Sequence, residues 1–273
     1  MADPNRRGGV PAGEDPPAPS TDLHLPIVDP KEVAEFLRGL PLAMDPGFAR
    51  FILGFPHKYL AETPRAEVVK HYALAGSLGS KPVISSLARA AERAWKLCVI
   101  TRDRRFLFSR IAGALSCFGM DIVSAEAFAN AGAVVLDTFH FRDGEGRFDE
   151  DALRRRFQVF LEEALEGTVD LDQELQARLG PQGLPPLAGL EVALEDDDEP
   201  ALGATRLLLR GPDCFALLYR VSRRLSEAGA DIQQAEIETS AGRVRDEFLL
   251  TRDGRPLDDD GRREVERALA AFG

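Results

Sequence analysis

The sequence predicts an α+β protein in which one small domain occurs twice, in tandem, after a short helical region. The first observation is a repeat: residues between Asp103 and Glu126 recur in the same order and at the same spacing between Asp213 and Glu236. The second is that apolar residues around each copy alternate between the spacing of a strand and that of a helix. Two copies with so few gaps indicate tandem domains. The matched residues are Asp103, Leu107, Arg110, Ile111, Leu115, Gly119, Asp121, Ile122, Ala125 and Glu126 against Asp213, Leu217, Arg220, Val221, Leu225, Gly229, Asp231, Ile232, Ala235 and Glu236, continued with a shift of one residue by Asp137 and Phe139 against Asp246 and Phe248.

The composition narrows the class of protein. The chain has 273 residues, of which 44% are hydrophobic and 29% charged, and its net charge is -11. That charge argues against nucleic acid as a partner. No apolar run reaches membrane-spanning length, and the N-terminus has no apolar signal core. Three scattered cysteines suit neither a metal site nor a disulfide framework. We therefore expect a cytoplasmic protein without metal or cofactor.

The N-terminal part is predicted to hold no strand. Residues 1–28 are rich in Pro, Gly, Asp and Ser and are expected to be a disordered tail. Residues 29–80 are expected to form a small helical region. One helix starts at Asp29-Pro30, where Asp suits the N-cap and Pro the first helical position. A second covers Phe48–Leu53, and a third starts at Thr63-Pro64.

The first repeated domain is expected at 82–166. Its strands are predicted at Val83–Ser86, Trp95–Thr101, Ile122–Phe128 and Val134–Phe141, and its helices at Phe106–Phe118 and Asp149–Leu165. Gly119 follows the first helix, where a left-handed cap favours glycine. The alanine-rich segment Leu87–Arg93 is helical in one interpretation.

The second domain is expected at 190–273, after a Pro- and Gly-rich linker at 167–189. Its strands are predicted at Leu190–Leu194, Thr205–Arg210, Ile232–Glu238 and Val244–Leu250, and its helices at Phe215–Ala228 and Asp258–Ala271. This order gives most of a ferredoxin-like βαββαβ unit. Neither copy needs a strand after its second helix, because the strand that precedes each copy can take that edge position. Either preceding strand could instead join the sheet of the other copy.

The two repeated segments resemble ACT domains. RDRRFLFSRIAGALSCFGMDIVSAEAFANAGAVVLDTF resembles the first ACT domain of the bifunctional PII-protein uridylyltransferase/uridylyl-removing enzymes, and ATRLLLRGPDCFALLYRVSRRLSEAGADIQQAEIETSAGRVRDEF resembles the second. The lead-in FPHKYLAETPRAEVVKH is similar to the segment that precedes them. The resemblance implies a glutamine-sensing region and covers the chain from about Phe55 onwards.

The resemblance also implies where a ligand would bind. ACT domains take an amino acid where the first strand meets the first helix, next to a glycine that lets backbone amides approach the ligand. That glycine aligns with Phe106 in the first copy and Ala216 in the second. The candidate ligand-binding residues are Asp103, Phe106 and Leu107, and Asp213, Ala216 and Leu217. The Phe106 ring is expected to fill its site, so the second copy is the better candidate.

Several carboxylates have a simpler interpretation. Asp103 and Asp213 precede helices, where turn or N-cap roles are common. Asp137 and Asp246 lie on apolar strand faces, where a carboxylate can mark a site, although an aspartate reaching a turn amide is commoner. The related enzymes need paired aspartates for Mg²⁺ and a His-Asp doublet. Asp196–Asp198 and Asp258–Asp260 are expected in a linker and at a helix start, where solvation and the helix dipole explain them. No histidine is followed by aspartate, so no catalytic residue is expected.

Three functions fit these observations. The first is a non-catalytic regulatory protein that binds a glutamine-like amino acid or controls the PII protein or a separate catalytic protein. The second is an interaction scaffold with degenerate ligand sites, which assembles with a partner or with a second copy as a homodimer. The third is the regulatory part of a split uridylyltransferase.

Overall fold

The computed structural model describes residues 36, 38, 45–53, 55, 57–79, 81–130, 132–196 and 203–270. The tail at 1–28 and the helix start at Asp29 lie outside these residues. Within them, no helix has the length and the hydrophobicity that crossing a bilayer requires.

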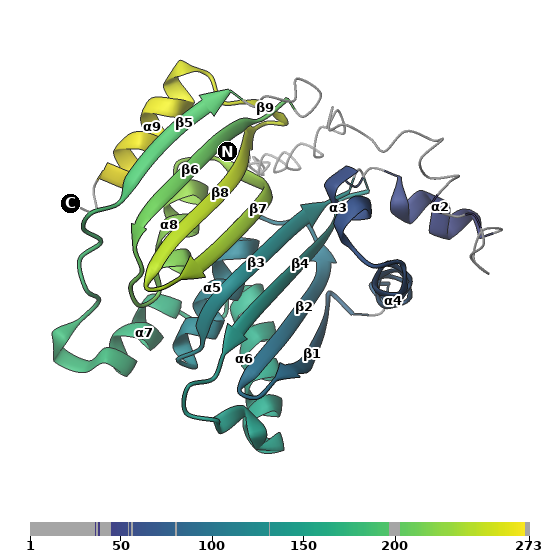
Figure 1. Cartoon of the computed structure of the whole chain (residues 1–273), viewed down its shortest axis with the longest axis horizontal. Helices are drawn as coiled ribbons and strands as arrows, with labels where there is room; N and C mark the ends of the chain where they lie inside the picture. The colour runs from purple at the N-terminus through teal and green to yellow at the C-terminus, as the bar shows by residue number, and fades with distance from the viewer. Residues whose placement is uncertain are drawn as a thin grey trace, which may run out of the picture.

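All strands join one antiparallel sheet in the order β1-β2-β4-β3-β7-β8-β6-β5, with the short β9 paired to β8 (Figure 1). The α+β class with two tandem ferredoxin-like units is confirmed. The strands are β1 (Val83–Ala91), β2 (Ala94–Arg102), β3 (Asp121–Ala129), β4 (Val134–Arg142), β5 (Glu191–Asp196), β6 (Thr205–Pro212), β7 (Asp231–Ser240), β8 (Arg243–Arg252) and β9 (Arg255–Pro256).

Each unit has two strands, a helix, two strands and a second helix. The helices of the units are α5 (Leu107–Cys117), α6 (Asp151–Glu166), α8 (Leu217–Glu227) and α9 (Asp259–Ala270). The preceding strands β1 and β5 pair with β2 and β6 of their own copies, which settles the alternative left open by the sequence. They occupy the edge next to the first strand of the unit, as predicted, so that strand is paired on both sides.

The segment Leu87–Arg93 is not helical. It forms the second half of β1 and the turn into β2, with Leu87 opposite Leu97 and Ala88 opposite Lys96. The helical interpretation relied on the alanines, but helix propensity is a weak effect that tertiary context overrides. Here the backbone ladder with β2 and the packing of Leu87 against the core decide the conformation.

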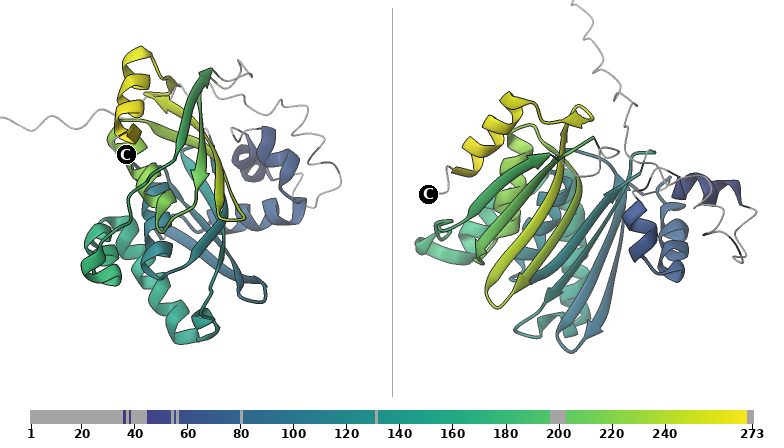
Figure 2. Two further views of the ribbon diagram at one scale, coloured as in Figure 1. Left: turned by 60° about the vertical axis from the view of Figure 1, so that its left-hand side comes forward. Right: turned by 45° about the horizontal axis from the view of Figure 1, so that its top comes forward.

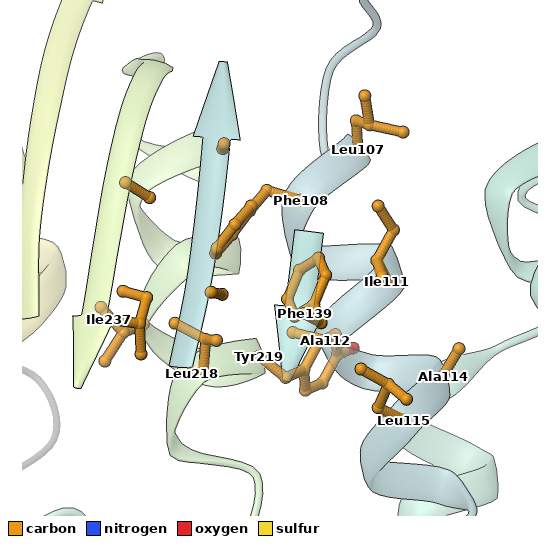
Figure 3. Close-up of a cluster of buried hydrophobic side chains, with 14 of the residues drawn as sticks. Leu107, Phe108, Ile111, Ala112, Ala114, Leu115, Phe139, Leu218, Tyr219 and Ile237 are labelled. Carbon is orange, nitrogen blue, oxygen red and sulfur yellow. The ribbon is translucent and has the colours of Figure 1, made fainter. Parts of the chain in front are cut away.

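The main core lies between the sheet and the helices α5 to α9. Phe108 of α5 packs against Phe139 of β4 at 5.1 Å between ring centroids and against Phe248 of β8 at 6.4 Å, so the core is continuous across the two copies. Figure 3 shows α5 beside Leu218 and Tyr219 of α8. The predicted glycine cap is present, since Gly119 has φ of 72° at the end of α5.

A second core lies on the opposite face of the sheet (Figure 2). There α2 (Pro46–Ile52), α3 (His57–Glu62) and α4 (Arg65–Ala75) cover strands of the first copy. The side chains that these strands contribute are Cys98, Ile100, Phe128 and Leu136. Because β2 is buried on both faces, its sequence is a continuous apolar run rather than an alternating one.

The linker expected at 167–189 contains a helix. α7 (Leu171–Leu179) starts at Asp170, whose carboxylate accepts hydrogen bonds from the Asp172 and Gln173 amides. Leu171 and Leu175 are buried in the main core. Apart from Gly167, the prolines and glycines that suggested a linker follow this helix, and the prediction overlooked the short segment before them, which has a good N-cap.

The two copies meet at β3 and β7 around a local twofold axis. Glu126 lies opposite Glu236 in this antiparallel pair, and the same two residues match each other in the repeat. The axis therefore passes between them. Lys58 of α3 forms an ion pair with Glu236 and reduces the repulsion between the facing carboxylates. The helical region thus contacts both copies.

Candidate functional site

Two cavities lie where the copies meet, one at the N-terminus of α5 and the other at the N-terminus of α8. The six candidate residues line them in two groups. Asp103, Phe106 and Leu107 line what we call the first-copy cavity, and Asp213, Ala216 and Leu217 line the second-copy cavity. The local twofold relates the two cavities, so each is built from matching residues of both copies. Their role in ligand binding stays a prediction.

The backbone explains why the related domains have glycine at one position of this loop. Phe106 has φ of 66° and Ala216 has φ of 57°, which is the left-handed region. A residue with a Cβ pays about 1–2 kcal/mol there, whereas glycine does not. The loops are held by backbone hydrogen bonds from the Asp103 amide to the Ala133 carbonyl and from the Asp213 amide to the Gly242 carbonyl.

The two cavities differ in size for a local reason. The first-copy cavity has a volume of about 40 Å³, and the second-copy cavity about 210 Å³. In the first copy, the Arg105 guanidinium lies over the Phe106 ring, 4.9 Å from its centroid, and donates hydrogen bonds to the Ser226 carbonyl at 3.2 and 2.7 Å. Phe215 and Ala216 occupy the matching positions of the second copy. The small Ala216 side chain leaves the second-copy cavity open.

A buried carboxylate lies against each cavity. Asp246 of β8 lines the second-copy cavity and is 2% exposed, and its Oδ1 has no hydrogen-bond partner. Asp137 of β4 lines the first-copy cavity and is 1% exposed, with no partner on either oxygen. The interpretation of Asp137 as a turn-directed aspartate is therefore wrong. Its strand position places it inside the sheet, where no turn amide reaches it.

Burial changes the protonation of both groups. It raises the pKa of Asp246 to about 7, with the neighbouring Asp213 carboxylate adding to the rise and a backbone hydrogen bond from Glu238 opposing it. Burial, and then repulsion by Asp103, raises the pKa of Asp137 well above its ordinary value. An unpaired buried carboxylate is costly when ionised. Such groups are candidates for ligand contact.

Each cavity has two further carboxylates nearer its mouth. In the second-copy cavity these are the half-buried Asp213 and the exposed Asp121, which starts β3 of the other copy. In the first-copy cavity the matching residues are Asp103 and Asp231. Sequence reasoning missed Asp121 and Asp231 as site residues, although both appear among the repeated residues. Among the described residues, no cluster of His, Cys, Asp and Glu has a metal-binding arrangement.

The helix ends add partial charges of opposite sign. The second-copy cavity is lined by Ala216, Leu217 and Leu218 at the N-terminus of α8 and by Ser116 and Gly119 at the C-terminus of α5. A helix N-terminus favours an anionic group and a C-terminus a cationic one. Neither α5 nor α8 has a side-chain hydrogen bond at its N-cap. The cavity thus suits a small molecule that carries both an anionic and a cationic group.

Comparison with known proteins finds bifunctional uridylyltransferase/uridylyl-removing enzymes among the relatives. A bifunctional uridylyltransferase/uridylyl-removing enzyme of Gluconobacter oxydans is 32% identical over 164 residues, covering 57% of this chain and 17% of the relative. Those of Phenylobacterium zucineum and Caulobacter vibrioides are 28% and 25% identical, covering 78% and 81% of this chain. This chain is therefore homologous to a partial region of such enzymes. It spans only 17% to 24% of the length of these three relatives. No family model matches the chain.

Proposed function

We propose that this chain is a non-catalytic regulatory module whose second-copy cavity binds an amino acid. The observation that carries the proposal is the open cavity of about 210 Å³ at the N-terminus of α8, beside a small residue in the left-handed conformation. Pockets for drug-sized ligands have about 300–1,000 Å³, so this volume suits a smaller molecule. The backbone amides at the helix end would receive its carboxylate.

Homology with uridylyltransferase/uridylyl-removing enzymes supports a role in nitrogen metabolism. The resemblance to their ACT domains makes glutamine the first ligand to test and the PII protein, or a separate catalytic protein, the first partner. None of the chain's aspartate pairs directly follows a Gly-Ser turn, and none of its histidines is followed by aspartate, which supports the non-catalytic assignment. In this proposal the module reports amino-acid availability to that partner.

Thermal unfolding of the full chain with each amino acid at millimolar concentration tests the proposal. A ligand that binds only the folded state stabilises it by about 2.7 kcal/mol at a hundredfold excess over Kd. We expect a concentration-dependent shift with at least one amino acid. Ala216→Phe should abolish it by adding a ring to the loop at the N-terminus of α8, as Phe106 does in the first copy, and so should Leu217→Asp. Phe106→Leu, in the smaller cavity, is the matched control and should keep the shift.

The absence of a shift with every amino acid would contradict the proposal and favour the second function, an interaction scaffold with degenerate sites. The small volume of the first-copy cavity, about 40 Å³, is the observation that supports this alternative. A shift that persists in Ala216→Phe would also count against the cavity as the site. Transfer of UMP to PII protein by the purified chain, dependent on Mg²⁺, would contradict the non-catalytic assignment.

A further inference from the structure

The two cavities carry the same three carboxylates in matching positions. Asp246, Asp213 and Asp121 line the second-copy cavity, and Asp137, Asp103 and Asp231 line the first-copy cavity. In each set the loop aspartate interacts with the other two. Asp213 is repelled by Asp121 and repels Asp246, and Asp103 repels both Asp137 and Asp231. In each cavity three carboxyl groups therefore lie close together, and each ionised one disfavours the ionisation of its neighbours.

The carboxylates of the second-copy cavity are arranged by depth. Asp246 lies deepest at 2% exposed, Asp213 is half-buried, and Asp121 is exposed. The buried Oδ1 of Asp246 has no partner. A buried acceptor without a donor loses its hydration and gains nothing in exchange. A donor that enters this cavity would find an acceptor already desolvated.

The first-copy cavity has a cationic side chain, Arg105, in its own lining, although both oxygens of its buried Asp137 have no hydrogen-bond partner. Burial and then repulsion by Asp103 raise the pKa of Asp231, and the charge of Arg105 opposes this rise. The guanidinium is held in place by the Ser226 carbonyl. In the second-copy cavity Phe215 occupies the matching position, and no Lys, Arg or His of the described residues lines that cavity. Its three carboxylates thus lack the internal cation that the first-copy cavity has.

We propose that the second-copy cavity binds a primary ammonium group, which pairs with Asp246 and Asp213. The C-terminus of α5, at Ser116 and Gly119, adds partial negative charge on the same side. This inference rests on the proposed function and deepens it: the ammonium group, rather than the carboxylate, provides most of the recognition. A charge-assisted hydrogen bond to a desolvated carboxylate is among the stronger polar contacts.

Calorimetric titration of the full chain with three probes tests the inference. The probes are L-glutamine, N-acetyl-L-glutamine, which has no ammonium group, and γ-aminobutyramide, which has no carboxylate. Glutamine and the amine should bind, and the acetylated compound should not. Asp246→Asn should weaken both by about tenfold or more, the effect expected for losing a charged partner. Asp137→Asn, the matching change in the first-copy cavity, should leave both affinities unchanged.

Exchange of the loop residues provides a second test that does not alter a carboxylate. Phe215→Arg with Ala216→Phe gives the second copy the first copy's residues at these two positions and places the new guanidinium near the Ser116 carbonyl, which matches that of Ser226. This variant should bind none of the probes. Arg105→Phe with Phe106→Ala should open the first-copy cavity and raise the stoichiometry from one to two per chain.

The outcomes separate the inference from the proposed function. Binding of γ-aminobutyramide alone, with the expected loss in Asp246→Asn, supports the ammonium site but contradicts an amino-acid sensor. Equal binding of glutamine and N-acetyl-L-glutamine, or an affinity that Asp246→Asn leaves unchanged, overturns the inference and leaves amino-acid binding in place. Failure of every amino acid and of the amine to bind overturns both.

Discussion

Asp246→Asn should stabilise the ligand-free protein near neutral pH and have little effect in acid. In the folded state burial keeps the pKa of Asp246 at about 7, against an ordinary value of 3.8. Between these values the folded state binds more protons than the unfolded state, so the free energy of unfolding decreases as pH rises. A shift of about three units corresponds to about 4 kcal/mol. The asparagine does not titrate and avoids this loss.

The side chain has the same shape, so packing should change little. Three groups surround Asp246: the Asp213 carboxylate in the loop between β6 and α8, the Glu238 backbone amide on β7, and the N-terminus of α8. Asparagine keeps an oxygen that can accept the hydrogen bond from Glu238. Its neutral amide also removes the repulsion that Asp213 exerts on an ionised Asp246.

Denaturant unfolding measured from about pH 4 to about pH 8 checks the prediction, because the midpoint and the slope together give the free energy of unfolding at each pH. The gain of the variant over the parent should grow with pH by about 4 kcal/mol and then level off above about pH 7. Glu163→Gln, on the exposed side of α6, controls for the change in net charge. A difference that does not depend on pH, or a variant that is less stable than the parent at about pH 8, would refute the reasoning.

Three further predictions concern stability. Ala216→Gly should raise the free energy of unfolding by about 1 kcal/mol in denaturant titration, because φ at this position is 57°; a decrease would show that the Ala216 methyl group packs usefully. His71 is buried, and burial is the main reason that its pKa is lowered to about 4. The stability that the neutral His71 contributes is therefore complete above about pH 6.5 and is lost as the pH falls towards 4. The difference in free energy of unfolding between the parent and His71→Leu should shrink by about 3 kcal/mol as the pH falls over this interval, and a constant difference would contradict this. Lys58→Ala should lower the free energy of unfolding by about 0.5–1 kcal/mol in the parent and by little in the Glu236→Gln variant. Equal losses in both would show that Lys58 and Glu236 do not stabilise each other.

The fold could be predicted because the repeat and the hydrophobic spacing agree. Each copy shows the same alternation of strand and helix, and Gly119 and Gly229 end the matching helices with positive φ. The edge positions of β1 and β5 followed from the need to pair the first strand of each unit. The segment Leu87–Arg93 could not be predicted in the same way, because its alanines fit either structure and only the pairing with β2 decides between them.

The candidate site could be predicted only in part. The loops at Asp103 and Asp213 follow from the order of strand and helix within one copy. Asp121 and Asp231 could not be assigned to the opposite loops, because that contact depends on the pairing of β3 with β7. Nothing local in the sequence specifies this register. The missing partner of Asp246 was also hidden, since an aspartate in a strand has the same sequence signal whether or not its oxygens are paired.

The loop residues and the three aspartates of each cavity can be changed independently. Both cavities have the three carboxylates, and the residues at 105–106 and 215–216 are among those that differ between the smaller cavity and the larger one. Exchanging those two pairs changes the space and the internal cation, and leaves every carboxylate in place. Changing Asp246 removes a charge and leaves the space. A ligand that responds to the first change alone is recognised by shape, whereas one that responds to both is recognised by its ammonium group.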